Sequence, residues 1–547
     1  MPRAAFVILR ALRGSRVSLF ITKLSHCPPP ESRHPEIQVE LPAHPKSMFN
    51  KILVANRGEI AIRVIRACHE LGITAVAVFS DVDRTALHVL HADEAYPIGR
   101  APATESYLNT ERILDAARRA GAQAIHPGYG FLSENPKFVR ACEDAGIKFV
   151  GPSASAMKAM GSKTRARQHM EKAGVPFVPG TARGLQSLDE AQQVAADLGF
   201  PVMLKAAAGG GGKGMRMVEK AADLASAFEA ARSEARRAFG DDEVYLEKAL
   251  INPRHIEMQV LADEHGNTVY LGERDCSIQR RHQKVLEEAP SPSVKPEMRR
   301  QMGEIAVRAA KAVRYTNAGT IEFLVDASGA FYFLEMNTRL QVEHPVTELI
   351  TGLDLVQLQI KIAAGENLPF SQRDVQIRGH AIECRIYAED PDNNYFPSPG
   401  TITSLVEPSG PGIRLDSGIY PGWKVPMDYD PLLAKLIGYG NSREQAIGRL
   451  RRALQEYSIG GIKTNLPLFR RILEQPEFLS GSVNTGLLAR MSDDAAKDGD
   501  TEQQQIAVIA AGVFSMLSGK SSSAATADTS DAAPSSWKRV ARTEALR

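Results

Sequence analysis

Short apolar runs alternate with amphipathic stretches along residues 48–150. The runs at 51–55, 73–79, 122–126 and 147–150 have the length of buried strands. Between them, residues 58–71, 108–120 and 136–145 place apolar side chains near helical spacing. Strands and helices that alternate with short connections predict a doubly wound parallel sheet of the α/β class. The turn Asn56-Arg57-Gly58-Glu59 after the first run lacks G-x-G-x-x-G, which argues against a nicotinamide dehydrogenase.

The pattern changes after residue 200, where segments of strand character become frequent. Strands are expected at 201–206, 244–248, 256–262 and 268–272, and residues 320–325 and 330–340 are expected to form a hairpin. Helices are expected at 297–313 and 441–457. A parallel α/β region is therefore followed by a region richer in strands.

Composition narrows the class of protein. The 547 residues hold 66 lysines and arginines against 64 acidic residues, a net charge of +2, which argues against a nucleic-acid partner. Hydrophobic residues make up 43% and charged residues 24%, as in ordinary globular proteins. The five cysteines show no metal-ligand or redox spacing, so we expect a reducing compartment and no structural disulfide.

The two ends differ from the middle. Residues 1–30 contain five basic residues, no acid and no apolar run near the roughly 20 residues of a membrane span. They resemble a mitochondrial transit peptide, but an over-long translation start before Met48 explains them as well and is favoured here. Residues 502–518 have helical character, and residues 519–536 form a flexible Ser/Ala/Thr/Asp linker before a short basic end with Trp537.

A glycine run at 209–212 provides the first chemical signal. Glycines leave backbone N–H groups uncovered, and such a loop can surround phosphate oxygens. Lys205 on the preceding strand and Lys213 in the loop favour a phosphate clamp over a plain flexible turn.

Two glutamates in the expected hairpin provide the second signal. With a two-residue turn at Ser328-Gly329, Glu322 pairs with Glu335 on one sheet face, with Cβ atoms about 5 Å apart. Facing carboxylates repel one another unless a cation lies between them, and magnesium prefers oxygen ligands. Asn337 would point the same way, which favours a magnesium site over a pair of solvated glutamates.

Polar residues alternate further along the chain. If the strand continues past Asn337, then Arg339, Gln341 and Glu343 lie on the face of Glu335, where Arg339 suits a small planar anion and Glu343 could act as a base. A solvated edge strand would show the same pattern. The stretch 272–284 is too polar to be a buried strand throughout, and in it His282 and Lys284 share parity and could both reach an anion.

At this point the sequence resembles the biotin carboxylase component of biotin-dependent carboxylases, an ATP-grasp enzyme. The strings that carry the resemblance are ANRGEIA from Ala55, HPGYGFLSEN from His126, the loop 209–215, ERDCSIQRRHQKV from Glu273, EMNTRLQVEHPVTE from Glu335 and RGHAIECRIYAEDP from Arg378. They run in family order over residues 48–490. The resemblance implies a Rossmann-like N-terminal domain at 48–161, an ATP-grasp domain at 162–376 with a mobile lid at about 178–250, and an α+β C-terminal domain at 377–491. Residues 1–47 and 492–547 would be an extension and a tail.

The resemblance also implies roles for single residues in nucleotide and metal binding. ATP is expected to contact Lys163, Lys205, Gly211, Gly212, Glu247, Lys248, Ala249, Leu250, His255, His282, Glu322 and Glu335. Two magnesium or manganese ions would be held by Glu322, Glu335 and Asn337. Ala249 departs from the aromatic common in the family, but only the backbone is expected to act there.

For the second substrate pair, the resemblance implies that Lys284, Arg339, Gln341 and Val342 bind bicarbonate. Glu343 would deprotonate bicarbonate, and Arg385 would bind biotin and stabilise its enolate-like form. The catalytic set would thus be Arg339, Glu343, Lys284 and Arg385. The reaction implied is the ATP-dependent carboxylation of biotin through carboxyphosphate, the first half-reaction of acetyl-CoA, propionyl-CoA or pyruvate carboxylase.

The partners follow from the same resemblance. Ala156-Met157-Lys158-Ala159-Met160 superficially matches a biotin attachment site, but its apolar surroundings favour a half-buried helix. Biotin is therefore expected on a separate carrier protein. The chain is also expected to form a homodimer and to act with a carboxyltransferase subunit, and residues 502–518 are expected to dock a partner subunit. A cytoplasmic location is expected, or the mitochondrial matrix if residues 1–47 are a transit peptide. The enzymatic alternative is the carbamoyl-phosphate synthetase large subunit, which repeats its grasp module; the other alternative is a non-catalytic nucleotide-binding regulator.

Overall fold

The computed structural model describes residues 48–161, 163–181, 183–207 and 215–491. The glycine run with Gly211 and Gly212, the N-terminal extension and the tail with its expected docking helix lie outside the described residues.

The N-terminal part is built on a parallel sheet, as the alternation of apolar runs predicts. Its strand order is β3-β2-β1-β4-β5, and every adjacent pair is parallel. The strands are β1 (Lys51–Val54), β2 (Thr74–Ser80), β3 (Glu94–Gly99), β4 (Ala124–His126) and β5 (Lys148–Phe149). The helices are α1 (Gly58–Glu70), α2 (Leu87–His91), α3 (Thr110–Ala120), α4 (Pro136–Asp144) and α5 (Ala154–Met160). Met157 and Met160 are buried and Lys158 is exposed, so α5 is the half-buried helix that was expected.

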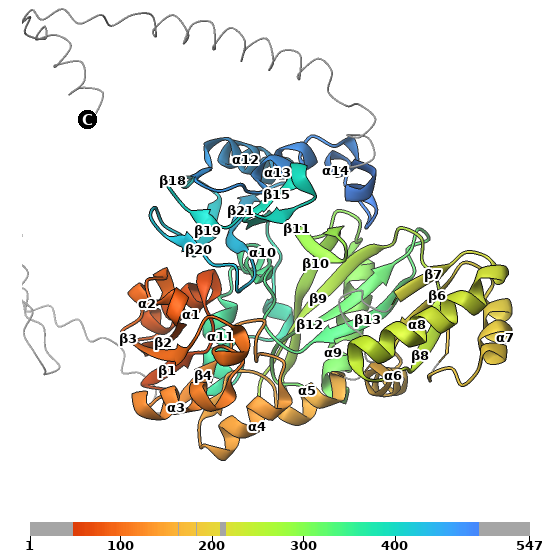
Figure 1. Ribbon diagram of the computed structural model, residues 1–547, viewed down its shortest axis with the longest axis horizontal. Helices are drawn as coiled ribbons and strands as arrows, with labels where there is room; N and C mark the ends of the chain where they lie inside the picture. Colours follow the sequence, from red (N-terminus) through yellow and green to blue (C-terminus); the bar gives the residue numbers. More distant parts are fainter. Residues whose placement is uncertain (1–47, 162, 182, 208–214, 492–547) are drawn as a thin grey trace, which may run out of the picture. The chain divides into compact units, whose positions relative to one another are not determined.

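An eight-stranded antiparallel sheet forms the middle of the molecule, in the order β13-β12-β9-β10-β11-β14-β21-β19 (Figure 1). Its strands are β9 (Arg254–Ala262), β10 (Thr268–Arg280), β11 (Gln283–Ala289), β12 (Asn317–Val325), β13 (Phe331–Asn337), β14 (His380–Tyr387), β19 (Ile413–Ser417) and β21 (Leu432–Gly440). The expected domain boundary at residue 376 does not interrupt this sheet, because β11 pairs with β14 from Leu286 to Ala289. The two halves therefore share one hydrogen-bonded framework.

Helices and short strand pairs complete the described chain. The remaining helices are α6 (Lys163–Lys172), α7 (Leu188–Leu198), α8 (Leu224–Phe239), α9 (Pro296–Ala312), α10 (His344–Thr351), α11 (Leu355–Ala363), α12 (Arg443–Glu456), α13 (Leu466–Ile472) and α14 (Pro476–Leu479). The short strands are β15 (Glu389–Asp390), β16 (Phe396–Pro397), β17 (Gly400–Thr401), β18 (Ser404–Val406), β20 (Lys424–Val425) and β22 (Ser458–Gly460). Among the described residues, no helix combines the length and the apolar character of a membrane span.

A small three-stranded sheet carries its own core. Strands β7 (Met215–Val218), β6 (Val202–Ala206) and β8 (Val244–Lys248) pair in that order, and α7 and α8 pack with them around residues such as Leu204, Phe228 and Leu246. Figure 1 shows this unit beside edge strand β13 of the large sheet, and a bridge between Phe177 and Phe333 links the segment that precedes it to β13. In sequence, the glycine run falls between β6 and β7.

The acidic hairpin is confirmed, with a different turn. Glu322 and Glu335 are cross-strand partners, as predicted. Nearer the turn, however, Phe323 pairs with Phe333 and Asp326 accepts from and donates to Ala330, so the expected partnership of residues 327 and 330 is wrong. A register shift between Glu322 and Phe323 absorbs the one-residue difference.

One expectation about extended structure is wrong, and another, that residues 272–284 are not a buried strand throughout, is confirmed. Strand β13 ends at Asn337, and residues 338–343 form a turn before α10, so the polar alternation up to Glu343 does not reflect a strand. In the basic stretch, the residues from Gly272 to Gln279 lie in buried strand β10, and only residues 280–284 are partly or fully exposed. Burial is tolerated because the charges are paired, as between Arg274 and Glu257.

Candidate active site

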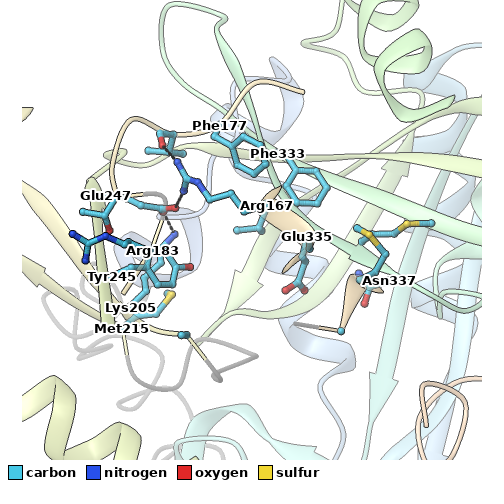
Figure 2. Close-up of a pocket in the computed structure, with 18 of the residues that line it drawn as sticks. Arg167, Phe177, Arg183, Lys205, Met215, Tyr245, Glu247, Phe333, Glu335 and Asn337 are labelled. Carbon is cyan, nitrogen blue, oxygen red and sulfur yellow. Dashed lines mark hydrogen bonds and ion pairs between the residues drawn. The ribbon is translucent and has the colours of Figure 1, made fainter. Parts of the chain in front are cut away.

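A cavity of about 290 Å³ lies between the small sheet and β13 (Figure 2). The small sheet contributes Lys205 from β6, Met215 from β7, and Tyr245 and Glu247 from β8. Strand β13 contributes the residues from Phe333 to Asn337, and α6 contributes Ala166 and Arg167. Of the predicted ATP ligands, the structure therefore brings Lys205, Glu247 and Glu335 to one cavity, with the predicted metal ligand Asn337.

Arg167 joins the basic side of this cavity and was not predicted. Its guanidinium lies 3.1 Å from Glu247 and 4.7 Å from the centre of the Phe177 ring, while Lys205 Nζ lies 2.5 Å from Glu247 Oε2. Figure 2 shows Arg167, Phe177 and Glu247 facing one another. Arg167 comes four residues after Lys163 on α6, and this helical spacing is the signal that could have identified it.

The carboxylate pair forms the other side of the site. Glu322 is 4% exposed, lies 2.9 Å from His255 Nε2, and accepts from Asn337 Nδ2 at 2.7 Å. Burial alone would raise the pKa of Glu322, but the charges of Lys284 and His255 outweigh it and hold the pKa far below its usual range. Burial would lower the pKa of His255, yet contact with Glu322 leaves it raised. Glu322 is therefore ionised in the folded protein.

Lys284 connects this pair to the rest of the site. Its ammonium lies 2.5 Å from Glu257 and 2.8 Å from both Glu322 and Glu343. An ammonium has three N–H donors, so three carboxylates use all of them. Burial would lower the pKa of Lys284, but these carboxylates raise it well above its usual value. Two groups with metal-ligand geometry, His255-Glu257-Glu322 and Glu257-Cys276-Glu343, both include carboxylates that Lys284 contacts.

Arg339 lies in the turn after β13 and binds neighbours with most of its donors. It donates from Nε to Glu134 at 2.9 Å, from Nη1 to Gln341 Oε1 at 2.9 Å, and from Nη2 to Asn337 Oδ1 at 3.2 Å. The Val342 carbonyl accepts from Lys435 at 2.9 Å. The turn thus brings together the predicted bicarbonate ligands Arg339, Gln341 and Val342, although the predicted strand is absent.

Glu343 and Arg385 meet at the end of this network. Glu343 is fully buried and lies 2.8 Å from Arg385 Nη2, which also contacts Glu287 at 2.5 Å. Burial would raise the pKa of Glu343, but Lys284 and Arg385 hold the pKa well below its usual value. The four predicted catalytic groups are linked, since Lys284 and Arg385 share Glu343, and Arg339 reaches Lys284 through Asn337 and Glu322.

The predicted ATP ligands near the ends of β8 and β10 lie apart from these contacts. His282 is exposed in the turn between β10 and β11, with a positive φ of 67°. Lys248 turns its ammonium to the carbonyls of Gly199 and Phe200, and the backbone N–H groups of Lys248 and Ala249 already donate to Pro179 and Pro201. Lys163 begins α6, and Leu250 follows β8.

The fold and the cavity define a nucleotide-dependent ligase of the ATP-grasp type. In it, the three-stranded sheet and the eight-stranded sheet lie on either side of a cavity lined by basic and acidic side chains. Three family descriptions match in sequence: "Biotin carboxylase, N-terminal domain" over residues 48–157, "Carbamoyl-phosphate synthase L chain, ATP binding domain" over 162–371 and "Biotin carboxylase C-terminal domain" over 383–490. The flanking matches distinguish the chain from the carbamoyl-phosphate synthetase alternative. The chain belongs to the biotin carboxylase family.

Relatives agree over most of the chain. Biotin carboxylase 1 of Bacillus subtilis is 53% identical over 442 residues, covering 81% of this chain and 98% of that protein. The chloroplastic biotin carboxylase of Arabidopsis thaliana is 53% identical over 448 residues, covering 82% of this chain and 83% of that protein.

Solved structures agree as well. The biotin carboxylase domain dimer of Hydrogenobacter thermophilus 2-oxoglutarate carboxylase, solved with MgADP, ADP and bicarbonate, has a TM-score of 0.78 at 51% identity and covers 81% of this chain and 98% of its own. The Campylobacter jejuni biotin carboxylase has a TM-score of 0.79 at 48% identity, covering 81% and 99%. ATP-dependent carboxylation of biotin, the predicted function, is the reaction of this family.

Proposed function

We propose that this chain is the biotin carboxylase component of a multi-subunit carboxylase and acts on biotin held by a separate carrier protein. The observation that carries the proposal is the buried chain of contacts from Glu322 through Lys284 and Glu343 to Arg385. It connects the carboxylates beside the cavity to the Arg385 guanidinium. Along this chain of contacts, Lys284 could bind bicarbonate and Arg385 could bind the enolate-like anion of biotin, next to the cavity proposed for the nucleotide.

The nucleotide would occupy the cavity between the small sheet and β13. Lys205 and Arg167 provide two positive charges, and the single carboxylate of Glu247 contacts them at 2.5 and 3.1 Å. A triphosphate would compete with Glu247 for these cations. The Glu247 carboxylate would then be free for a ribose or base donor. Lys163 and the glycine loop are proposed to complete the phosphate site.

The carboxylate pair suits a divalent cation. Glu322, Glu335 and Asn337 offer oxygen donors from neighbouring positions of one hairpin, which is the donor set that magnesium prefers. Rotation of the Asn337 amide exchanges its nitrogen and oxygen, so the side chain that donates to Glu322 could also present an oxygen there. When bound, the ion would offset the charge of the nucleotide phosphates.

Bicarbonate would bind beside Lys284 and Arg339, with Gln341 and the Val342 backbone as further contacts. In the described arrangement Glu343 is a weak base, because Lys284 and Arg385 both stabilise its ionised form. An anion that draws Lys284 away would raise the basicity of Glu343 at the moment when bicarbonate needs to lose a proton. Substrate binding and base activation would thus be coupled.

Arg385 would bind biotin and stabilise the negative charge that develops on its ureido oxygen. The γ-phosphoryl group of ATP passes to bicarbonate, which gives carboxyphosphate and ADP. The ureido nitrogen then takes the carboxyl group, and the departing phosphate accepts the proton that this nitrogen loses. Because carboxyphosphate is unstable in water, the residues around the cavity must also exclude solvent during the reaction.

The assembly around the chain is proposed at a coarser level. A carrier protein and a carboxyltransferase subunit would complete the carboxylase, and the dimeric Hydrogenobacter domain supports a homodimer. We further propose domain boundaries at 48–161, 162–376 and 377–491, and a cytoplasmic location. The predicted docking role of residues 502–518 would be tested by deleting 492–547 and measuring co-purification.

Bicarbonate-dependent ATP hydrolysis, with and without free biotin, tests the proposal. Arg339→Ala should abolish the activity, while Lys158→Ala, at an exposed position of α5, should retain it. Equal losses in both variants, or ATP hydrolysis that ignores bicarbonate, would overturn the site assignment.

A further inference from the structure

Glu287 in strand β11 is a buried acid that the mechanism above does not use. Its side chain is fully buried, and its Oε1 accepts from Arg385 Nε at 2.6 Å and contacts Nη2 at 2.5 Å. Among the described residues, its second oxygen, Oε2, has no hydrogen-bond partner. Within the described residues, the Glu287 carboxylate therefore makes its hydrogen bonds with Arg385, and only through Oε1.

The sheet register explains why Glu287 reaches Arg385. Glu287 is the cross-strand partner of Glu383, and Arg385 is the partner of Lys435. Residues 383 and 385 lie on the same face of β14, so two acids and two bases share a buried layer across three strands. Both oxygens of Glu383 lack a hydrogen-bond partner within the described chain, which leaves Glu287 as the acid of this layer that holds the guanidinium.

Arg385 has a second carboxylate neighbour, and the two have different consequences. Arg385 Nη2 lies 2.8 Å from Glu343 Oε2, on the bicarbonate side of the site. If Glu287 were absent, Glu343 would be the carboxylate left in contact with the guanidinium, which would move towards it. That movement would draw positive charge from the place where biotin is proposed to bind and would further stabilise the ionised Glu343.

We propose that Glu287 is a positioning residue for the biotin step, because it fixes the Arg385 guanidinium between itself and Glu343. This inference rests on the proposed role of Arg385. It predicts that loss of Glu287 impairs the transfer of the carboxyl group to biotin more than the ATP-dependent activation of bicarbonate. A merely structural ion pair would impair both in the same proportion.

The test uses the full-length chain and compares two rates in each variant. One rate is bicarbonate-dependent ATP hydrolysis without biotin, and the other is carboxylation of free biotin. Glu287→Ala should lower kcat for biotin carboxylation about 100-fold, the loss typical of a group displaced by about 1 Å. The KM for ATP should stay within about twofold, since no contact on the nucleotide side changes.

Two further variants separate position from charge. Glu287→Gln keeps an oxygen that can accept from Arg385 Nε, so we expect partial rescue, with a loss of about tenfold. Glu288→Gln is the matched control: Glu288 is the adjacent buried residue of β11 and binds His380 and Arg443 instead. Its ratio of the two rates should equal that of the wild type.

The outcomes distinguish the inference from the proposed function. If Arg385→Ala leaves biotin carboxylation intact, the proposed role of Arg385 fails. If Arg385→Ala abolishes carboxylation but Glu287→Ala lowers both rates equally, or neither, then Glu287 is a structural partner and the inference fails. A selective loss in Glu287→Ala with partial recovery in Glu287→Gln supports it.

Discussion

Glu59 should make the stability of the protein fall as the pH rises. This carboxylate is 4% exposed at the start of α1, 3.2 Å from Lys435 Nζ. Burial raises the pKa of Glu59 from 4.5 to about 7, despite the attraction of Lys435. An acid whose pKa is higher in the folded protein binds more protons when folded, so the free energy of unfolding decreases through that window. At 1.36 kcal/mol per pKa unit, the cost is about 3 kcal/mol, absent below about pH 4 and complete above about pH 8.

The variant Glu59→Gln removes this titration with little change in shape. Urea unfolding at a series of pH values from about 4.5 to 8, at one ionic strength, gives the difference in unfolding free energy between variant and wild type. We expect that difference to shift by about 3 kcal/mol in favour of the variant as the pH rises. Using the difference cancels other titrating groups, such as His126, whose pKa burial lowers to about 3.

An exposed glutamate on α4 provides the control for this measurement. Glu143→Gln makes the same exchange of a carboxylate for an amide at an exposed position rather than a buried one. If the Glu59→Gln difference varies by less than about 1 kcal/mol, then Glu59 does not carry the cost of burial and the reasoning fails.

Three other measurements test the site and the fold. Lys205→Ala should raise the dissociation constant of ATP about 10- to 100-fold in calorimetry, because a charge-assisted contact with phosphate is lost; an unchanged value would remove Lys205 from the nucleotide site. Glu322→Gln should weaken Mn²⁺ binding by about tenfold or more in electron paramagnetic resonance titrations, since a carboxylate ligand becomes an amide. Burial raises the pKa of Cys68 and Cys142 to about 12, so neither should react with iodoacetamide at about pH 8 before unfolding, as read by peptide mass spectrometry.

Much of the N-terminal fold could be predicted because four of the five strands of its sheet are short apolar runs that precede a helix. The predicted strand at 51–55 and helix at 58–71 correspond to β1 and α1 almost residue for residue. Strand β3 gives no such signal, because EAYPIG contains a proline and only Ile98 is buried. An edge strand pairs with only one other strand and is less buried, so its sequence need not be a continuous apolar run.

The acidic pair shows why a site can be predicted more reliably than its local backbone. A two-residue turn places Glu322 opposite Glu335, and so does the longer turn of the structure together with one register shift. The prediction had the turn one residue too short and lacked the register shift. These two differences offset each other, so Glu322 still pairs with Glu335. The pairing of the two carboxylates could be predicted although the turn could not, because more than one turn geometry places the same two residues opposite each other.

Lys284 shows where counting parity along a strand fails. Its predicted companion His282 shares its parity, yet His282 lies in the turn, with a positive φ. A register shift within the β10–β11 pairing then sets the face to which Lys284 points. There it meets Glu257, Glu322 and Glu343, which come from three different segments of the chain. Spacing along one segment cannot predict such a meeting. Because the ammonium has no donor left, the proposed binding of bicarbonate to Lys284 requires that a carboxylate be displaced, so this geometry would also determine how the proposed base Glu343 is released.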